Sequence, residues 1–284
     1  MYYVGLIIVV LSVGVGYVFM GGHLNVLWQP FEFLIILGSG IGAFLSANRM
    51  SFIKKIISAM TRAMSDKCLQ KEEYLELLSV LYSIFKLSRA KSMIAIEPHI
   101  EAPHESSIFQ KYPTFLNNHV AVDLFCDYIR MISMGVEDPM IIDDMMRDEV
   151  EAIQHENMQK VHAMNILADS MPALGIVAAV LGVIHTMGSI AEAPEVLGAL
   201  IGGALVGTFC GILVSYGMFA PTAGRMHQII ELDNKYYDCI KAGVVGFMHK
   251  LPPIIAAESA RKCVEHEFRP TYTEMEDALN SISL

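Results

Sequence analysis

The chain has 284 residues, of which 54% are hydrophobic, and its mean hydropathy is +0.44. Ordinary soluble domains rarely combine such a composition with uncharged apolar runs of about 20 residues, so the composition excludes this class and predicts an integral membrane protein. The formal net charge is −10, and we expect membrane lipid but no nucleic acid around the protein.

Two apolar runs occupy the N-terminal part. Residues 1–31 contain no Asp, Glu, Lys or Arg, and residues 33–48 form a second, shorter run. A helix of about 20 residues rises about 30 Å and can cross the hydrocarbon core of a bilayer. The first run has no basic leader and no A-x-A-like cleavage site, which favours a retained anchor over a signal peptide. We therefore assign residues 1–48 to transmembrane helices 1 and 2.

Residues 49–168 are expected to form a cytoplasmic helical domain. Apolar residues recur every three or four positions between Lys71 and Met93, which predicts an amphipathic helix. Its buried stripe would consist of Leu75, Leu78, Tyr82 and Phe85. Arg89 lies in the basic last turns, where a cation complements the negative end of the helix dipole. From Ile141 onward, the pattern predicts one long helix with acidic polar faces that enters the third span.

Residues 169–224 are expected to form a membrane hairpin, because two long apolar runs cover residues 170–191 and 196–224. Small residues recur at spacings of three or four in the spans. They are Gly38 and Gly42 in the second span, Gly175, Ala179 and Gly182 in the third, and Gly203, Gly207 and Gly211 in the fourth. Such stripes allow close packing, either between helices of this chain or against a partner helix.

Four residues of this hairpin are candidates for a function in the membrane. Thr208 is the hydroxyl in the middle of the fourth span, and Ala179 lies equally far from the connecting loop, so both should lie at similar depth. The Thr208 hydroxyl could also bond a carbonyl of its own helix. Pro172 and Pro221 lie toward the cytoplasmic ends, where each removes a backbone donor and can loosen or kink its helix.

Basic residues set the expected topology. Those beside the spans are Arg49, Lys54, Lys55, Arg62, Lys67, Lys160 and Arg225. Residues 21–30 and 190–195, at the opposite ends of the spans, contain no Lys or Arg. The positive-inside rule therefore predicts a multi-pass protein with both termini in the cytoplasm, together with residues 49–168 and the helical C-terminal tail, residues 225–284.

The sequence contains no recognisable catalytic or metal-binding constellation. Its five cysteines lack CxxC or His-paired spacing, and His155 and His162 share a helix face without a third ligand. Neither a phosphate-binding loop nor a GxSxG motif occurs. We therefore expect neither an enzyme nor a metal or cofactor site.

Four segments together resemble one protein family. They are ADSMPALGIVAAVLGVIHTMGS, ALVGTFCGILVSYGMFAP, LWQPFEFLIILGSGIGAF and KLSRAKSMIAIEPHIEAPHESSIF. The combination resembles the MotA stator subunits of the bacterial flagellar motor, in the MotA/TolQ/ExbB group, over almost the whole chain. The resemblance implies an all-α integral membrane protein with four transmembrane helices and a large helical cytoplasmic domain between spans two and three. TolQ and ExbB have three spans.

The resemblance also implies a function in the cell inner membrane. Subunits of this family couple inward ion flow to torque on the rotor, as a pentamer around a dimer of MotB. MotB supplies the ion-binding aspartate and the peptidoglycan anchor. The residues matching Arg89 and Glu97 contact the rotor protein FliG, and those matching Pro172 and Pro221 couple ion passage to movement.

The resemblance favours H⁺ over the alternative, Na⁺. Sodium-driven relatives carry a threonine at the position of Ala179, paired with the threonine that matches Thr208. Alanine removes an oxygen that a hard cation would need, since such ions take several oxygen ligands.

Two alternatives stay open. A self-sufficient ion transporter or channel would need an acid or a broken-helix ion site within the membrane, and the nearest acids, Glu32 and Asp169, lie at span edges. An energiser of outer-membrane processes similar to ExbB or TolQ is the other; the fourth span and the segment of Arg89 and Glu97 speak against it.

Overall fold

The protein is all-helical, as predicted. The computed structural model describes residues 1–65 and 68–282, and this part contains helices and turns but no strand. The main helices are α1 (Tyr2–Phe19), α2 (Leu24–Leu27), α3 (Pro30–Ala47), α4 (Met50–Met64), α5 (Lys71–Lys91), α6 (Glu97–Glu101), α7 (Pro113–Asn117), α8 (His119–Ser133), α9 (Pro139–Met187), α10 (Pro194–Val214), α11 (Ala220–Met248), α12 (Pro253–Cys263) and α13 (Tyr272–Asn280). Lys67, counted above for the topology, lies outside the described residues.

Four helical segments are long and apolar enough to cross a membrane. They are Tyr2–Phe19, Leu24–Ala47, the apolar part of Pro139–Met187 and the apolar part of Pro194–Met248. This confirms the four predicted spans. The predicted long helix that enters span three is also confirmed, because α9 runs without interruption from the polar segment into the apolar one.

Packing divides the chain into two compact units. One boundary lies between α4 and α5, and the other two fall inside α9 and α11. The first unit comprises residues 1–67 and 157–229, and the second comprises residues 68–156 and 230–284. These units follow the contacts between parts of the backbone, whereas the predicted boundaries after residues 48, 168 and 224 follow the membrane surface. The latter stay predictions.

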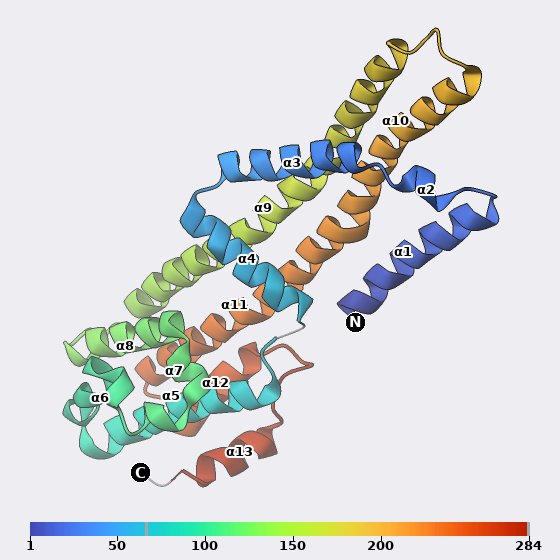
Figure 1. Cartoon of the computed structure of the whole chain (residues 1–284). Helices are drawn as coiled ribbons and strands as arrows, with labels where there is room; N and C mark the ends of the chain where they lie inside the picture. The colour runs from blue at the N-terminus through green and yellow to red at the C-terminus, as the bar shows by residue number, and fades with distance from the viewer. Residues whose placement is uncertain (66–67, 283–284) are drawn as a thin grey trace. The chain divides into compact units, whose positions relative to one another are not determined.

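The bounds of the first two membrane helices differ from those of the apolar sequence runs. The first helix ends at Phe19, and the chain turns between α1 and α2 (Figure 1). Gly21, in this turn, adopts a left-handed conformation with φ +82°. Helix α3 begins at Pro30, so Glu32 lies in its first turn. No residue of α1 is buried in this chain, so its apolar surface is available to lipid or to other helices.

Helix α5 forms the centre of the second unit. Its N-terminus is closed by a reciprocal pair of hydrogen bonds between Gln70 and Glu73. The predicted helix between Lys71 and Met93 is confirmed, but the predicted buried stripe is too narrow. Because α7, α12 and α13 pack around α5, the fully buried residues also include Tyr74, Leu77, Leu81 and Ile84. Leu75 and Tyr82 of the predicted stripe are only partly buried.

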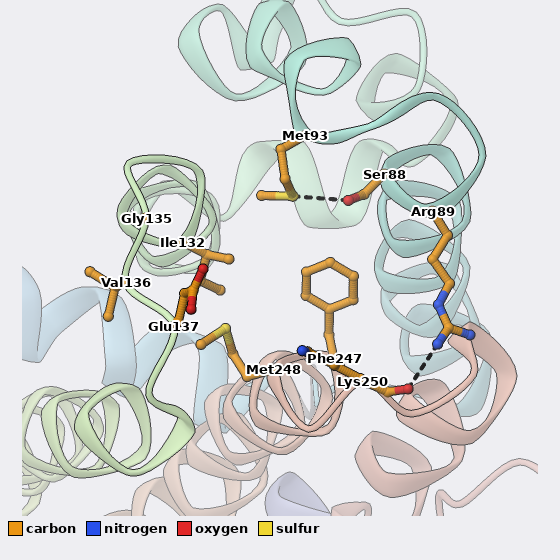
Figure 2. Close-up of a pocket in the computed structure, with 10 residues that line it drawn as sticks. All are labelled: Ser88, Arg89, Met93, Ile132, Gly135, Val136, Glu137, Phe247, Met248 and Lys250. Carbon is orange, nitrogen blue, oxygen red and sulfur yellow. Dashed lines mark hydrogen bonds between the residues drawn. The ribbon is translucent and has the colours of Figure 1, made fainter.

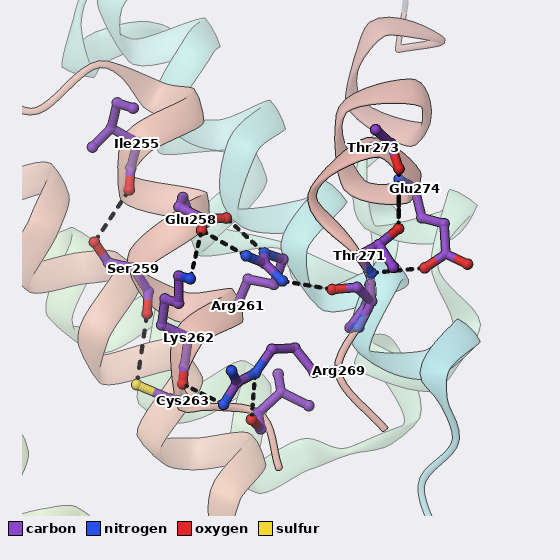
Figure 3. Close-up of polar contacts among 12 residues, drawn as sticks. Ile255, Glu258, Ser259, Arg261, Lys262, Cys263, Arg269, Thr271, Thr273 and Glu274 are labelled. Atoms are coloured by element: carbon purple, nitrogen blue, oxygen red, sulfur yellow. Dashed lines mark hydrogen bonds and ion pairs between the residues drawn. The ribbon is translucent and has the colours of Figure 1, made fainter. Parts of the chain in front are cut away.

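Two arginines close the turn between α12 and α13 (Figure 3). Arg261, which is 6% exposed, donates to the Glu258 carboxylate at 2.6 and 2.7 Å and to the Pro270 carbonyl at 2.7 Å. Arg269 donates to the carbonyl of Val264 at 2.9 Å. The hydrogen bonds from Arg261 hold the pKa of Glu258 below its ordinary value. Helix α13 is thereby anchored to the second unit.

Candidate functional site in the membrane hairpin and on the second unit

The helices α9 and α10 approach each other backbone to backbone. A Cβ atom on Gly175 would lie 2.9 Å from the carbonyl oxygen of Gly207, and one on Gly211 would lie 2.6 Å from the carbonyl oxygen of Met171. Because there is no room for side chains, these glycines set the distance between the helices. The small-residue stripes of the third and fourth spans therefore pack against each other within the chain. Gly203 instead contacts the side chain of Gln29.

Ala179 and Thr208 lie beside this glycine crossing. A Cβ atom on Gly207 would lie 3.2 Å from the backbone nitrogen of Ala179, and one on Gly175 would lie 3.3 Å from the Cα of Thr208. Both residues are partly exposed. The Thr208 hydroxyl makes no hydrogen bond to another described residue, so the bond to its own helix considered above is absent. The hydroxyl is available to a group from outside the chain.

The two prolines occupy different backbone settings. Pro172 lies inside the continuous helix α9 and is partly exposed. Pro221 is the exposed second residue of α11, and it lies two residues after the end of a π-helical segment, Ser215–Phe219, that joins α10 to α11. A π turn places one extra residue in the helical turn and frequently marks a functional site. The sequence pattern did not indicate this segment.

A buried serine contacts the backbone next to Pro172. The Ser215 hydroxyl donates a 2.7 Å hydrogen bond to the carbonyl of Ala168, which is the residue four positions before Pro172. Sequence reasoning missed this residue as a functional candidate. The loss of a donor at Pro172 indicated that the carbonyl needed another partner, but the partner depends on the register of the two helices.

The acids nearest to the membrane differ in their surroundings. Asp169 is exposed. Glu32 is partly exposed, but one of its carboxylate oxygens, Oε2, is buried and has no hydrogen-bond partner in the described part of the chain. A buried carboxylate oxygen without a donor is unfavourable when it is charged. No group of three His, Cys, Asp or Glu residues within residues 1–65 and 68–282 could hold a metal ion.

The second unit presents Arg89 at the rim of a pocket (Figure 2). The pocket has a volume of about 450 Å³. Its residues are Ser88, Arg89, Met93, Ile132, Gly135, Val136, Glu137, Phe247, Met248 and Lys250. Figure 2 shows Arg89 and Glu137 on opposite sides, with Phe247 between them. The apolar floor and the two opposite charges could receive part of another protein.

Arg89 does more than complement the dipole of its own helix. Its Nη2 atom donates a 2.8 Å hydrogen bond to the carbonyl of Lys250, in the turn between α11 and α12. Lys250 itself adopts a left-handed conformation with φ +60°. Glu97 is the exposed first residue of α6 and does not line the pocket. The structure therefore leaves both charges at the surface without an ion pair between them.

Two family models match two separate parts of the chain. The model described as "Motility protein A N-terminal" matches residues 3–92, and the one described as "MotA/TolQ/ExbB proton channel family" matches residues 117–238. Curated relatives match over nearly the full length. Motility protein A of Salmonella typhimurium is 37% identical over 98% of this chain and 94% of the relative, and that of Escherichia coli is 36% identical over the same shares. Chemotaxis protein LafT of Vibrio parahaemolyticus is 31% identical over 96% of both chains.

Solved structures with the same fold include two motor assemblies. The structure of C. jejuni MotAB matches with a TM-score of 0.73 at 17% identity, covering 94% of this chain and 96% of that chain. The flagellar MotAB stator complex from Bacillus subtilis matches with a TM-score of 0.69 at 22% identity, covering 94% and 97%. At these identities the likeness concerns the fold, and it extends over both compact units.

Proposed function

The chain belongs to the Motility protein A family, and we infer that it is a stator subunit of the bacterial flagellar motor. Together with MotB, it couples inward proton flow to torque on the rotor. The assignment to a MotB partner is supported by the two solved neighbours, which are MotAB assemblies. This role requires no catalytic group, and we propose that the chain is not an enzyme.

One observation carries the proposed mechanism. The Thr208 hydroxyl is partly exposed and unpartnered beside a crossing of bare glycine backbone, and no acid lies next to it on α9 or α10. An ion path through lipid needs a group that can bind and release the ion, because charges in the membrane are expensive. The hairpin therefore acts as a wall, and the titrating carboxylate comes from the MotB helix that passes along it.

The transported ion follows from the same surface. The proton channel description of the matching family supports H⁺. Ala179, beside the glycine crossing, contributes only a methyl group where a threonine would contribute an oxygen. A sodium ion would lose a ligand there, whereas a proton bound to a carboxylate needs no coordination shell. Na⁺ remains the alternative ion.

Rotor contact is proposed for the charged surface of the second unit. Arg89 and Glu97 are both exposed and carry opposite charges, and the pocket beside Arg89 has an apolar floor. Surface charges of this kind steer a partner and set its register more than they add affinity. We assign this surface to the rotor protein FliG, and Pro172 and Pro221 to the coupling of ion passage to movement.

The proposed assembly is a pentamer of this chain around a MotB dimer in the cell inner membrane, with both termini in the cytoplasm. The bare surface of α1 supports contacts outside the chain, because none of its residues is buried by the rest of the protein. The distribution of basic residues beside the spans supports the orientation.

Deleting the gene tests the proposed function. We expect cells that assemble filaments of normal number and length but do not swim, and that swim again when the chain is expressed from a plasmid. Counting filaments separately from swimming distinguishes a motor defect from an assembly defect. Normal swimming of the deletion strain would remove the proposal.

A self-sufficient transporter is the second candidate, and the surroundings of Glu32 favour it. Its Oε2 atom is buried and has no hydrogen-bond partner among the described residues, and an acid at the edge of a span is a feature that such a transporter would need. In the stator assembly, a donor from a neighbouring chain would satisfy the same oxygen. The two candidates differ in whether this chain conducts alone.

A further inference from the structure

The two prolines of the hairpin lie in different helices, and the structure links them through one residue. Proline has no backbone N–H, so Pro172 cannot donate to the carbonyl of Ala168, its partner in an α-helix. The Ser215 hydroxyl donates to that carbonyl at 2.7 Å. Ser215 is fully buried, at 0% exposure, so water does not compete for this bond.

The backbone of Ser215 belongs to the second irregular site. Ser215 is the first residue of the π segment that ends at Phe219, and its carbonyl accepts the N–H of Ala220, five residues later. Pro221 follows at once and again contributes no N–H. The side chain of Ser215 thus supplies the hydrogen bond that Pro172 cannot donate. The main chain of Ser215 begins the π segment that precedes Pro221.

Another buried hydroxyl of the same hairpin shows that this arrangement is not required of every hydroxyl in the spans. Thr186, which is 1% exposed, donates to the carbonyl of Gly182 in its own helix at 2.9 Å. Such a bond adds nothing between helices. The hydrogen bond of Ser215 instead connects the end of α10 to α9, where the glycines hold the two helices close together.

We propose that Ser215 is a positioning residue that makes the two proline sites move as one hinge. The inference rests on the proposed function, since it concerns how the movement of α9 reaches the junction of α10 and α11. A shift of α9 at Pro172 that separates the Ala168 carbonyl from Ser215 would leave a buried carbonyl without a donor. Because leaving this carbonyl without a donor costs free energy, the π segment before Pro221 moves with α9. The cytoplasmic ends of α9 and α10 then move together.

The motor test compares Ser215→Ala with Ser215→Thr, which keeps a hydroxyl, and with Thr186→Ala as the matched control. Each variant is expressed in the deletion strain, and the torque of single tethered motors is measured at equal membrane abundance. We expect Ser215→Ala to lower torque at least about twofold, because an unpartnered carbonyl disturbs the balance between two packed arrangements. Thr186→Ala should match the wild type, and Ser215→Thr should exceed Ser215→Ala. Equal torque of Ser215→Ala and wild type would overturn the proposal.

A second measurement tests the bond itself and does not depend on motor function. In the purified complex, Pro172→Ala restores a backbone N–H that can donate to the Ala168 carbonyl. We expect Ser215→Ala to lower the thermal unfolding midpoint in the wild-type background, and to lower it much less in the Pro172→Ala background. Equal shifts in both backgrounds would refute the link between the prolines. A wild-type chain that fails to restore rotation would contradict the proposed function instead.

Discussion

Gly211 lies directly against the backbone of Met171: a Cβ atom on Gly211 would stand 2.6 Å from the Met171 carbonyl oxygen and 2.8 Å from the Cα of Gly175. These neighbours are main-chain atoms, which cannot rotate away as a flexible side chain can. The approach of α9 to α10 therefore depends on the absence of a side chain at this position.

Gly211→Ala is expected to separate the two helices and to lower stability by about 1–3 kcal/mol, the usual effect of overpacking. Gly198→Ala is the matched control, because Gly198 lies in the same helix with nothing within 4 Å of its Cβ position. Alanine is the better helix former, so this variant should be neutral or slightly stabilised. The measurement is thermal unfolding of the purified complex by circular dichroism. Equal midpoints for the two variants would contradict the tight crossing.

Charge reversal on the second unit should impair the motor without unfolding the protein. Arg89→Glu removes one exposed hydrogen bond, to the Lys250 carbonyl, which contributes about 0.5–1.5 kcal/mol to folding, and Glu97→Lys alters an exposed group. We expect swimming speed to fall while the amount of protein in the membrane stays normal. Arg147→Glu, at an exposed arginine of the same unit, should swim normally. Normal swimming of both test variants at low expression would remove the rotor-contact assignment.

The docking of α13 on α5 should weaken in acid through Glu274. The backbone N–H of Thr271 donates to Glu274 at 2.7 Å, and the Lys71 ammonium pairs with it at 2.9 Å. These contacts lower the pKa of Glu274 from 4.5 to about 2, and the hydrogen bond from the Thr271 backbone contributes most. A lowered pKa in the folded state means that the stabilisation is present above pH 4.5 and is lost as the pH falls toward 2.

Unfolding midpoints of the complex between pH 5 and pH 2.5 test this dependence. Over this range, the unfolding midpoint should fall further for the wild type than for Glu274→Gln, because the variant lacks the titrating group. Asp277→Asn, at an exposed acid of the same helix, should behave as the wild type does. If the wild type and Glu274→Gln showed the same slope, the assignment to Glu274 would be wrong.

The chain alone should not conduct protons. We expect no proton uptake into proteoliposomes that contain this chain without MotB, under an imposed potential, and clear uptake when an unplugged MotB is present. The reason is that the two apolar runs of the hairpin, residues 170–191 and 196–224, contain no Asp or Glu. Uptake by the chain alone that Glu32→Gln abolishes would instead support the self-sufficient transporter. Asp169→Asn serves as the comparison at an exposed acid.

Much of the fold could be predicted from local patterns. Helices α5 and α9 follow from apolar spacing and from charge on their outer faces, because these features depend on neighbours three or four residues away. The ends of the first two spans could not be predicted from hydropathy. The apolar sequence continues through the turn at Gly21 and up to Pro30, so only backbone conformation separates the helices.

The sequence predicts individual residues of the candidate site but not the contacts between them. The sequence indicates that Pro172 frees a carbonyl, but the donor from Ser215 depends on the register between two helices. Likewise, the acceptor of Arg89 is a carbonyl at Lys250, far along the chain. The sequence also could not show that Thr208 makes no hydrogen bond to another described residue, because any helical threonine can bond a carbonyl of the preceding turn.

The most direct test of coupling is the rotation of single tethered cells of the deletion strain while this chain is induced and the proton-motive force is varied at fixed external sodium. The account predicts that rotation begins with expression, that speed falls and recovers with the proton-motive force, and that removing sodium at constant pH and potential changes nothing. Rotation without the chain, or a speed that follows sodium instead of the proton-motive force, would contradict it.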